Sequence, residues 1–131
     1  MDAVCLLVAG VLRATLPGPE FTLAWQHSVE KIPWEERYRI EPGRLRLVAV
    51  RVRGHGAGME PPPEATLHDG VWSWSPGSTV AELRLARGSA TADYTLCSAG
   101  RCRSLGQWVD RPADDGVVVL RACAEAPAHR R

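Results

Sequence analysis

The sequence predicts an all-β protein, a single small antiparallel β-sandwich or barrel of about eight strands. Apolar and polar residues alternate with a period of two through most of the 131 residues, and no apolar run keeps helical spacing over three turns. Turn-forming groups separate the alternating segments at short intervals, which is typical of sandwiches and small barrels. These groups are Pro17-Gly18-Pro19, Pro42-Gly43, Asp69-Gly70, Pro76-Gly77, Ala99-Gly100 and Asp115-Gly116.

The strand pattern recurs in order along the chain. Phe21, Leu23 and Trp25 alternate with polar or small neighbours, so this segment is expected to be a strand with one buried face. Tyr38 and Ile40 alternate in the same way with arginines. In all, eight or nine strands are expected, at residues 4–12, 21–26, 37–41, 44–53, 71–74, 80–86, 92–97, 101–108 and 117–123.

The segment 44–53 changes phase part of the way along. Its apolar positions begin as Leu45 and Leu47 and continue as Val48, Val50 and Val52. Because a shift of one residue turns every following side chain to the other face of a sheet, the pattern predicts a β-bulge near Leu47 and Val48, or a strand that moves between two sheets.

Length and charge limit the classes of protein to which the chain can belong. One β domain over residues 1–123 accounts for the strands, and 124–131 is expected to be a disordered tail. The 16 basic and 15 acidic residues nearly cancel, so nucleic acid is not an expected partner. The longest apolar run, residues 4–12, is shorter than the roughly 20 residues of a membrane span. No export signal is visible after Met1-Asp2, since a positively charged start is missing.

Four cysteines suggest two disulfides. Cys97 and Cys102 flank a short turn, and Cys5 and Cys123 lie in strand-like segments near opposite ends of the chain. The simplest pairing is 97 with 102 and 5 with 123, although four cysteines permit three pairings and free buried thiols are the alternative. If both disulfides form, the protein belongs in an oxidising compartment.

Two loop-like segments, 25–36 and 54–62, gather the residues most suited to function. Loops carry binding and catalytic groups more often than the strands beside them. A serine nucleophile at Ser28 is not expected, because on an extended strand Ser28 and His27 point to opposite faces. We therefore predict no catalytic residue and no enzyme activity. The predicted partner- or ligand-binding residues are His27, Ser28, Glu30, Trp34, Glu35, Glu36, Gly54, Gly56, Gly58, Met59 and Glu60.

Metal and anion binding are further hypotheses for the same two segments. His27, Glu30, His55 and Glu60 could supply imidazole and carboxylate ligands to a divalent metal, although no spacing is diagnostic. The alternative is that these side chains form ordinary hydrogen bonds and surface ion pairs. The glycine-rich run 54–58 could bind a carboxylate through its backbone amides. No cofactor is predicted.

Several motifs resemble one family. They are Trp25-x-His27-Ser28-Val29-Glu30, Trp34-Glu35-Glu36, Gly54-x-Gly56-Ala57-Gly58-Met59-Glu60-Pro61-Pro62 and the pair Cys97 and Cys102. Together these motifs resemble the domain of unknown function 1850 family. Its members are small bacterial proteins typically encoded beside the fused membrane subunit of TAXI-type TRAP transporters.

The resemblance implies a non-enzymatic accessory domain of such a transporter. The expected partner is the membrane subunit or the solute-binding protein, and the expected location is the periplasm or the outer face of the inner membrane. A family resemblance supplies context but no mechanism. The competing hypothesis is a binding module for a small carboxylate or a divalent metal.

Overall fold

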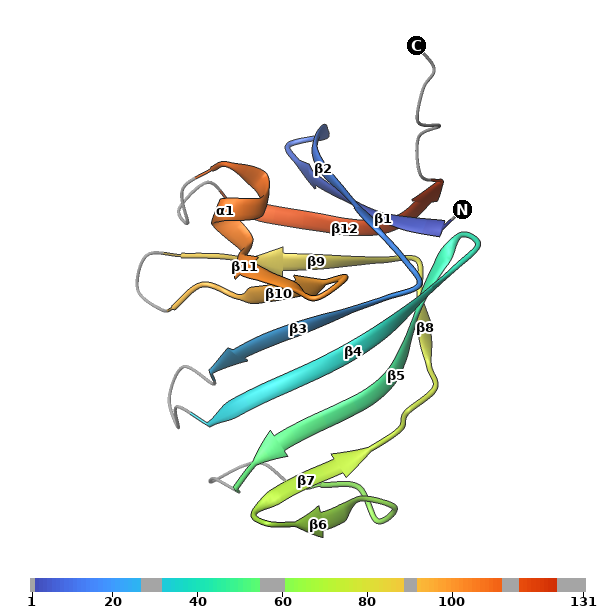
Figure 1. The fold of residues 1–131 in the computed structure, drawn as a ribbon, viewed down its shortest axis with the longest axis vertical. Helices are drawn as coiled ribbons and strands as arrows, with labels where there is room; N and C mark the ends of the chain where they lie inside the picture. The colour runs from blue at the N-terminus through green and yellow to red at the C-terminus, as the bar shows by residue number, and fades with distance from the viewer. Residues whose placement is uncertain (1, 27–31, 55–60, 89–91, 112–115, 125–131) are drawn as a thin grey trace.

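The alternating segments fold into two antiparallel β-sheets, sheet A and sheet B (Figure 1). The computed structural model describes residues 2–26, 32–54, 61–88, 92–111 and 116–124. Over these residues the chain forms twelve strands and one short helix, α1 (Leu105–Val109). The sandwich-like arrangement of two sheets confirms the predicted all-β class.

Sheet A pairs the two ends of the chain. Its order is β2-β1-β12-β9, and β1 pairs with β12 from Asp2 opposite Ala124 to Val8 opposite Val118. The single strand predicted over 4–12 is wrong, because Ala9 and Gly10 adopt positive φ and turn the chain back. Of the predicted tail, Ala124 belongs to β12, and 125–131 lie outside the described residues. The strands are β1 (Asp2–Val8), β2 (Val11–Pro17), β9 (Glu82–Ala86) and β12 (Val117–Ala124).

Sheet B is larger and carries the segments singled out in the sequence. Its strands follow the order β11-β10-β3-β4-β5-β7-β6, and β8 pairs with the start of β5. Figure 1 shows β3, β4, β5 and β7 fanning out below sheet A. The strands are β3 (Glu20–Gln26), β4 (Pro33–Glu41), β5 (Arg44–Arg53), β6 (Thr66–His68), β7 (Val71–Trp74), β8 (Thr79–Val80), β10 (Thr95–Ser98) and β11 (Arg101–Ser104).

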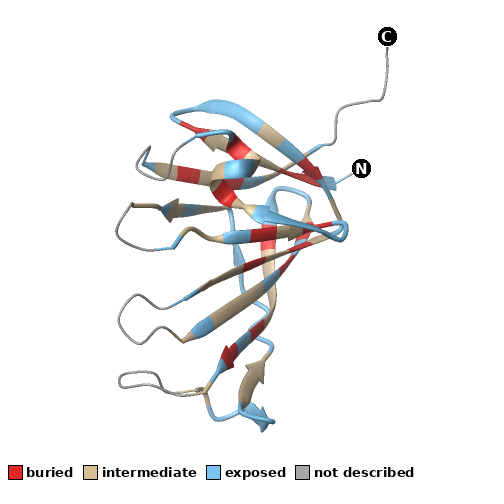
Figure 2. Cartoon of the chain, turned by 60° about the vertical axis from the view of Figure 1, so that its left-hand side comes forward, coloured by how far each residue is buried: buried red, intermediate tan, exposed pale blue. Residues whose placement is uncertain are grey.

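The core lies between the inner faces of the two sheets (Figure 2). Every second side chain of a strand points to the same face, so the apolar halves of the alternating segments meet there. Leu105 and Val109 of α1 are also fully buried. The cluster includes Val4, Leu6, Val118 and Leu120 from sheet A and Phe21, Leu23, Tyr38, Ile40, Leu45 and Leu96 from sheet B.

The predicted bulge in β5 is confirmed. Arg37 pairs with Ala49, whereas its neighbour Tyr38 pairs with Leu47, so Val48 is the extra residue. Beyond Val48, Val50 and Val52 point inward and are 2% and 0% exposed. Because of the bulge, the inward-facing residues are apolar both before and after the point where the alternation changes phase.

The predicted strand 101–108 is wrong in its second half, where α1 forms. Ser104 begins the helix with a capping box: its hydroxyl accepts a bond from the Gln107 amide, and the Gln107 side chain accepts one from the Ser104 amide. Leu105 and Val109 lie four residues apart on the buried side. The Ser-x-x-Gln signal was present in the sequence, but the alternation of 101–104 masked it.

Two other predicted strands are shorter than expected. The segment 80–86 is divided into β8 and β9 at Ala81, and 92–97 becomes a strand only at Thr95. The strands β2 and β6 were not predicted as separate elements. β2 pairs with β1, and β6 pairs with β7.

Both predicted disulfides are present, Cys5 with Cys123 and Cys97 with Cys102. The first joins β1 to β12, and the second joins directly opposed residues of β10 and β11. Disulfides persist in oxidising compartments, so the pair is compatible with a location outside the cytoplasm. No helix among the described residues is long and apolar enough to cross a membrane.

We predict that the two disulfides differ in their contribution to stability. Cys5 and Cys123 are separated by 118 residues, and Cys97 and Cys102 by 5. The loop-entropy relation gives about 4–5 kcal/mol for the long loop and about 2 kcal/mol for the short one. Urea unfolding of Cys5→Ser/Cys123→Ser and of Cys97→Ser/Cys102→Ser should therefore show the larger loss for the first variant. Equal losses, or a larger one for the hairpin variant, would contradict this ranking.

Candidate functional site

The two functional segments of the sequence leave sheet B at the same edge. Gln26 of β3 pairs with Pro33 of β4, and Arg53 of β5 pairs with Val71 of β7. Because β4 pairs with β5, the loops after β3 and β5 begin on neighbouring parts of this edge. His27, Ser28, Glu30, His55, Gly56, Gly58, Met59 and Glu60 lie outside the described residues, so their binding and metal-ligand roles stay predictions. Within the described ranges, no three His, Cys, Asp or Glu side chains gather to hold a metal.

Gly54 marks the start of the second segment and has a backbone reason to be glycine. Its φ is +74°, a conformation that other residues adopt at a cost. Its amide donates to the carbonyl of Gly70 at 2.6 Å, which ties the end of β5 to the β6–β7 turn. Gly54, the first residue of the glycine-rich segment, is therefore needed for the backbone conformation at the end of β5.

Trp34, Glu35 and Glu36 follow one another on β4 and alternate between its faces. Trp34 and Glu36 lie on the inner side with Tyr38, whereas Glu35 lies on the outer side opposite Arg51. The structure therefore does not bring the three to one face. Only Glu35 lies on the outer face of sheet B, which is turned away from the core.

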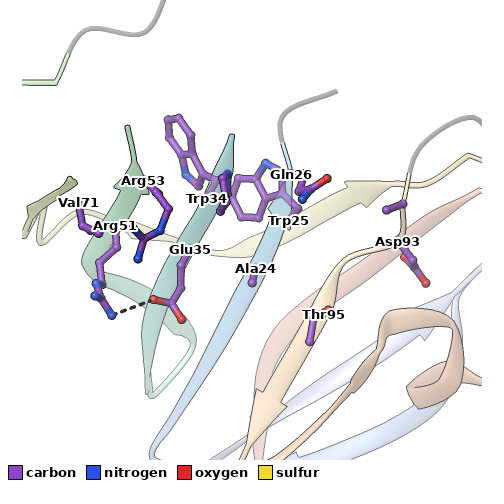
Figure 3. A pocket seen from close by; sticks show the side chains of 12 residues that line it. Ala24, Trp25, Gln26, Trp34, Glu35, Arg51, Arg53, Val71, Asp93 and Thr95 are labelled. Atoms are coloured by element: carbon purple, nitrogen blue, oxygen red, sulfur yellow. Dashed lines mark hydrogen bonds and ion pairs between the residues drawn. The ribbon is translucent and has the colours of Figure 1, made fainter. Parts of the chain in front are cut away.

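The inner side at this edge is aromatic. The rings of Trp25 and Trp34 stack with centroids 6.0 Å apart, and Tyr94 tilts against Trp25 at 5.6 Å (Figure 3 shows the two indoles side by side). Trp34 and Trp72 face Val52 from the strands on either side, and the indole N–H groups of both are buried without a hydrogen-bond partner among the residues that the structure describes. The aromatic row extends the apolar interior to the edge where the loops begin.

Glu36 is held by a tyrosine inside the protein. The hydroxyl of Tyr38 donates to Oε1 of Glu36 at 2.7 Å. Burial raises the pKa of Tyr38 above its usual range, and the hydrogen bond and negative charge of Glu36 raise it further. Burial also raises the pKa of Tyr94, with additional contributions from the charges of Asp93 and Glu36. Glu36 therefore belongs to a partly buried hydrogen-bonded pair.

The outer face of sheet B is hollowed at the edge where the loops begin (Figure 3). This loop-end hollow has a volume of about 440 Å³. Glu35, Arg51 and Arg53 carry its charges on β4 and β5, and Nη1 of Arg51 lies 3.5 Å from Oε1 of Glu35. The lining consists of Ala24, Trp25, Gln26, Pro33, Trp34, Glu35, Arg51, Arg53, Val71, Ala92, Asp93 and Thr95.

A second hollow continues along the strands from the first. This mid-sheet hollow has a volume of about 710 Å³ and shares Glu35 and Arg51 with the loop-end hollow. Its other lining residues are Thr22, Arg37, Ala49, Glu64, Thr66, Ser73, Trp74 and Ser75. The pair Glu35 and Arg51 thus stands between two depressions of one face.

A buried ion pair fixes the far wall of the loop-end hollow. Oδ2 of Asp93 accepts from Nη1 of Arg87 at 3.1 Å and from the amide of Gly106 at 2.8 Å, while Oδ1 accepts from the amide of Tyr94. The Arg87 side chain is only 1% exposed. A Cβ on Gly106 would lie 3.0–3.2 Å from Arg111, Arg87 and Asp93, so glycine permits this close approach. The charge of Asp93 is therefore already matched by Arg87 and is not free for a ligand.

The described lining is equipped for binding. Guanidinium groups recognise carboxylates through paired N–H donors, and the threonine and serine hydroxyls can donate or accept hydrogen bonds. Arg51 and Arg53 were not among the residues that the sequence predicts for binding. The signal that could have marked them is their position immediately before Gly54, where the strand meets the second functional segment.

Comparison with known proteins gives one match. A family model described as "Domain of unknown function (DUF1850)" matches residues 21–105. The match spans nearly all of sheet B together with β8 and β9, and β1, β2 and β12 lie outside it. Searches of curated proteins and of solved structures gave no match. The matched region thus contains every described residue of the two hollows.

We predict that Tyr38→Phe lowers stability and changes its alkaline pH dependence. Losing the bond to Glu36 should cost about 1–2 kcal/mol near pH 8. A tyrosine whose pKa is raised by folding contributes stability below the unfolded pKa of about 10 and loses it as the pH rises further. Each such tyrosine makes the free energy of unfolding fall by up to about 1.4 kcal/mol more per pH unit above that pKa.

Urea unfolding between pH 8 and 11.5 measures both effects. Tyr38 and Tyr94 are the two tyrosines, and Lys31 is the one lysine, so few other side chains titrate in this window. Tyr38→Phe should show a shallower fall of stability than the parent protein. Tyr94→Phe is the comparison variant. Its stability should also fall less steeply, because burial raises the pKa of Tyr94 too, but it keeps the Tyr38–Glu36 bond whose loss lowers the stability of Tyr38→Phe near pH 8. If stability falls with pH as steeply in Tyr38→Phe as in the parent protein, then Tyr38 has the same pKa in the folded and unfolded states.

Proposed function

Because the chain belongs to the family described as domain of unknown function (DUF1850), we propose that it is a non-enzymatic accessory domain of a TAXI-type TRAP transporter. In this proposal it works in the periplasm or at the outer face of the inner membrane. It contacts the membrane subunit or the solute-binding protein. The link to the transporter comes from the resemblance of the loop motifs, all of which lie within the matched region.

The outer face of sheet B is the observation that carries the proposal. Arginines project from it on β4 and β5, and each of four lies within 4.0 Å of a carboxylate: Arg37 and Arg39 contact Glu20, Arg46 contacts Glu41, and Arg51 contacts Glu35. Arginine is enriched in protein interfaces, where its planar group can pair with a partner's carboxylates. The face also carries the mid-sheet hollow, which can accept protruding side chains of a partner.

The disulfides support the proposed location. Both lie in or between paired strands, and one joins the two ends of the chain. Such bonds are kept oxidised in the periplasm and reduced in the cytoplasm. The proposed location therefore agrees with the chemistry of the four cysteines.

The placement of Glu35 and its neighbours decides which residues can test a contact. Trp34 and Glu36 lie inward, so their removal would disturb packing as well as any interface. Arg37 and Arg39 have side chains that are 53% and 55% exposed. Charge reversal at Arg37 and Arg39 therefore changes the outer face and leaves the core intact.

We predict that Arg37→Glu/Arg39→Glu weakens binding to the membrane subunit or the solute-binding protein by at least about tenfold, because the reversed charges repel acidic groups of the partner. Binding can be measured by biolayer interferometry with the detergent-purified membrane subunit and with the solute-binding protein. The matched control is Arg84→Glu on sheet A, whose side chain is 64% exposed. Arg84→Glu should bind within about twofold of the parent protein. No association with either component, or equal binding by the folded double variant, would refute the proposed contact.

A further inference from the structure

We propose that the loop-end hollow is a binding site for a small organic carboxylate. In this site Arg51 and Arg53 bind the carboxylate group, and an apolar part of the ligand lies against Ala24, Pro33 and Val71. The proposal concerns a site on the described residues and does not depend on the transporter contact. It assigns the site to strand arginines, separate from the glycine run after Gly54.

The strand geometry places the two arginines together. Arg51 and Arg53 are two residues apart on β5, so both project from the outer face, with Cα atoms about 7 Å apart. Arg51 is opposite Glu35 on one side and Ser73 on the other, and Arg53 is opposite Val71. A carboxylate between the two guanidinium groups can therefore reach both, with an apolar side chain beside it.

Among the described residues, the charges around the hollow leave Arg53 without an ion pair. Arg51 makes a single 3.5 Å contact with Glu35, and both side chains are well exposed, at 59% and 42%. Arg53 forms no ion pair with any residue that the structure describes. The remaining acid of the lining, Asp93, is matched by Arg87. The described lining therefore has one positive charge in excess, and a bound carboxylate would neutralise it.

The size and floor of the hollow suit a small ligand. Its volume of about 440 Å³ lies within the range of roughly 300–1,000 Å³ that is typical of small-molecule sites. Ala24 and Thr95 are opposite each other on β3 and β10, and because their side chains are short they leave space for a ligand above the strands. A ligand can therefore lie against the strands, with its apolar part on the alanine, proline and valine of the lining.

The test uses acetate, succinate and benzoate as probes, titrated into the intact, oxidised protein and followed by two-dimensional NMR of the backbone amides. We expect saturable shifts confined to the strands around the hollow, and tighter binding of benzoate than of acetate because its ring covers the apolar lining. Trp25 and Trp34 border the same hollow, so tryptophan fluorescence gives an independent readout.

Four variants separate the site from general charge attraction. Arg51→Gln and Arg53→Gln should each weaken benzoate binding by at least about tenfold, since each removes a charge-assisted hydrogen bond. Ala24→Leu should also abolish binding, because it fills the floor without changing the charge. Arg44→Gln is the matched control: Arg44 is on the same strand and face but outside both hollows, so binding should be unchanged.

Several results would overturn the proposal. One is that none of the three acids binds saturably. Another is that Arg51→Gln and Arg53→Gln bind benzoate as tightly as the parent protein does. A third is that Arg44→Gln loses as much benzoate affinity as those two variants. An acidic peptide that binds through Arg51 and Arg53 when none of the small acids does would likewise overturn it. That last outcome would assign the hollow to a protein partner.

Discussion

The bulge at Val48 is the constraint that connects the interior of this protein to its candidate site. Before the bulge, Leu45 and Leu47 point into the core, and an unbroken alternation would turn Arg51 and Arg53 inward as well. The extra residue reverses the phase, so that Val50 and Val52 are buried and the two arginines face outward. One inserted residue therefore gives β5 an apolar inner side along its whole length and a charged outer side at the loop edge.

Sheet A packs on the part of the inner face of sheet B that carries the core cluster, and the outer face of sheet B stays uncovered by it. β1 and β12 form the middle of sheet A, and both β2 and β9 are attached to them. The pairing of the first strand with the last, joined by Cys5 and Cys123, thus holds in place the surface against which sheet B packs. The inner side of sheet B carries the core residues, so the proposed contacts with a partner or ligand use its outer side.

The two faces of sheet B give neighbouring residues of one motif different roles. The motif consists of Trp34, Glu35 and Glu36. Trp34 stacks on Trp25 and Glu36 accepts a bond from Tyr38, so both contribute to the interior. Glu35 contacts Arg51 on the outer face. A motif that looks like one functional cluster in the sequence is therefore a structural pair and a surface residue, because side chains on a strand alternate.

The sequence by itself determined the features that depend on local alternation and turn chemistry. These include the all-β class, the bulge in 44–53, and the turns at Pro42-Gly43, Asp69-Gly70 and Ala99-Gly100. The same local signals misassigned 4–12, where a turn lies within an apolar run, and 101–108, where a capping box begins a helix.

Only the tertiary structure decided which strands are neighbours, and with that the candidate site. Arg51, Arg53, Ala24 and Thr95 lie on three strands far apart in the chain, and pairing across sheet B brings them to one hollow. Alternation specifies which face each of these residues occupies, but the order of the strands follows from the joint burial of all inner faces. The sequence therefore specified the face on which each of these residues lies, whereas their proximity follows only from the tertiary structure.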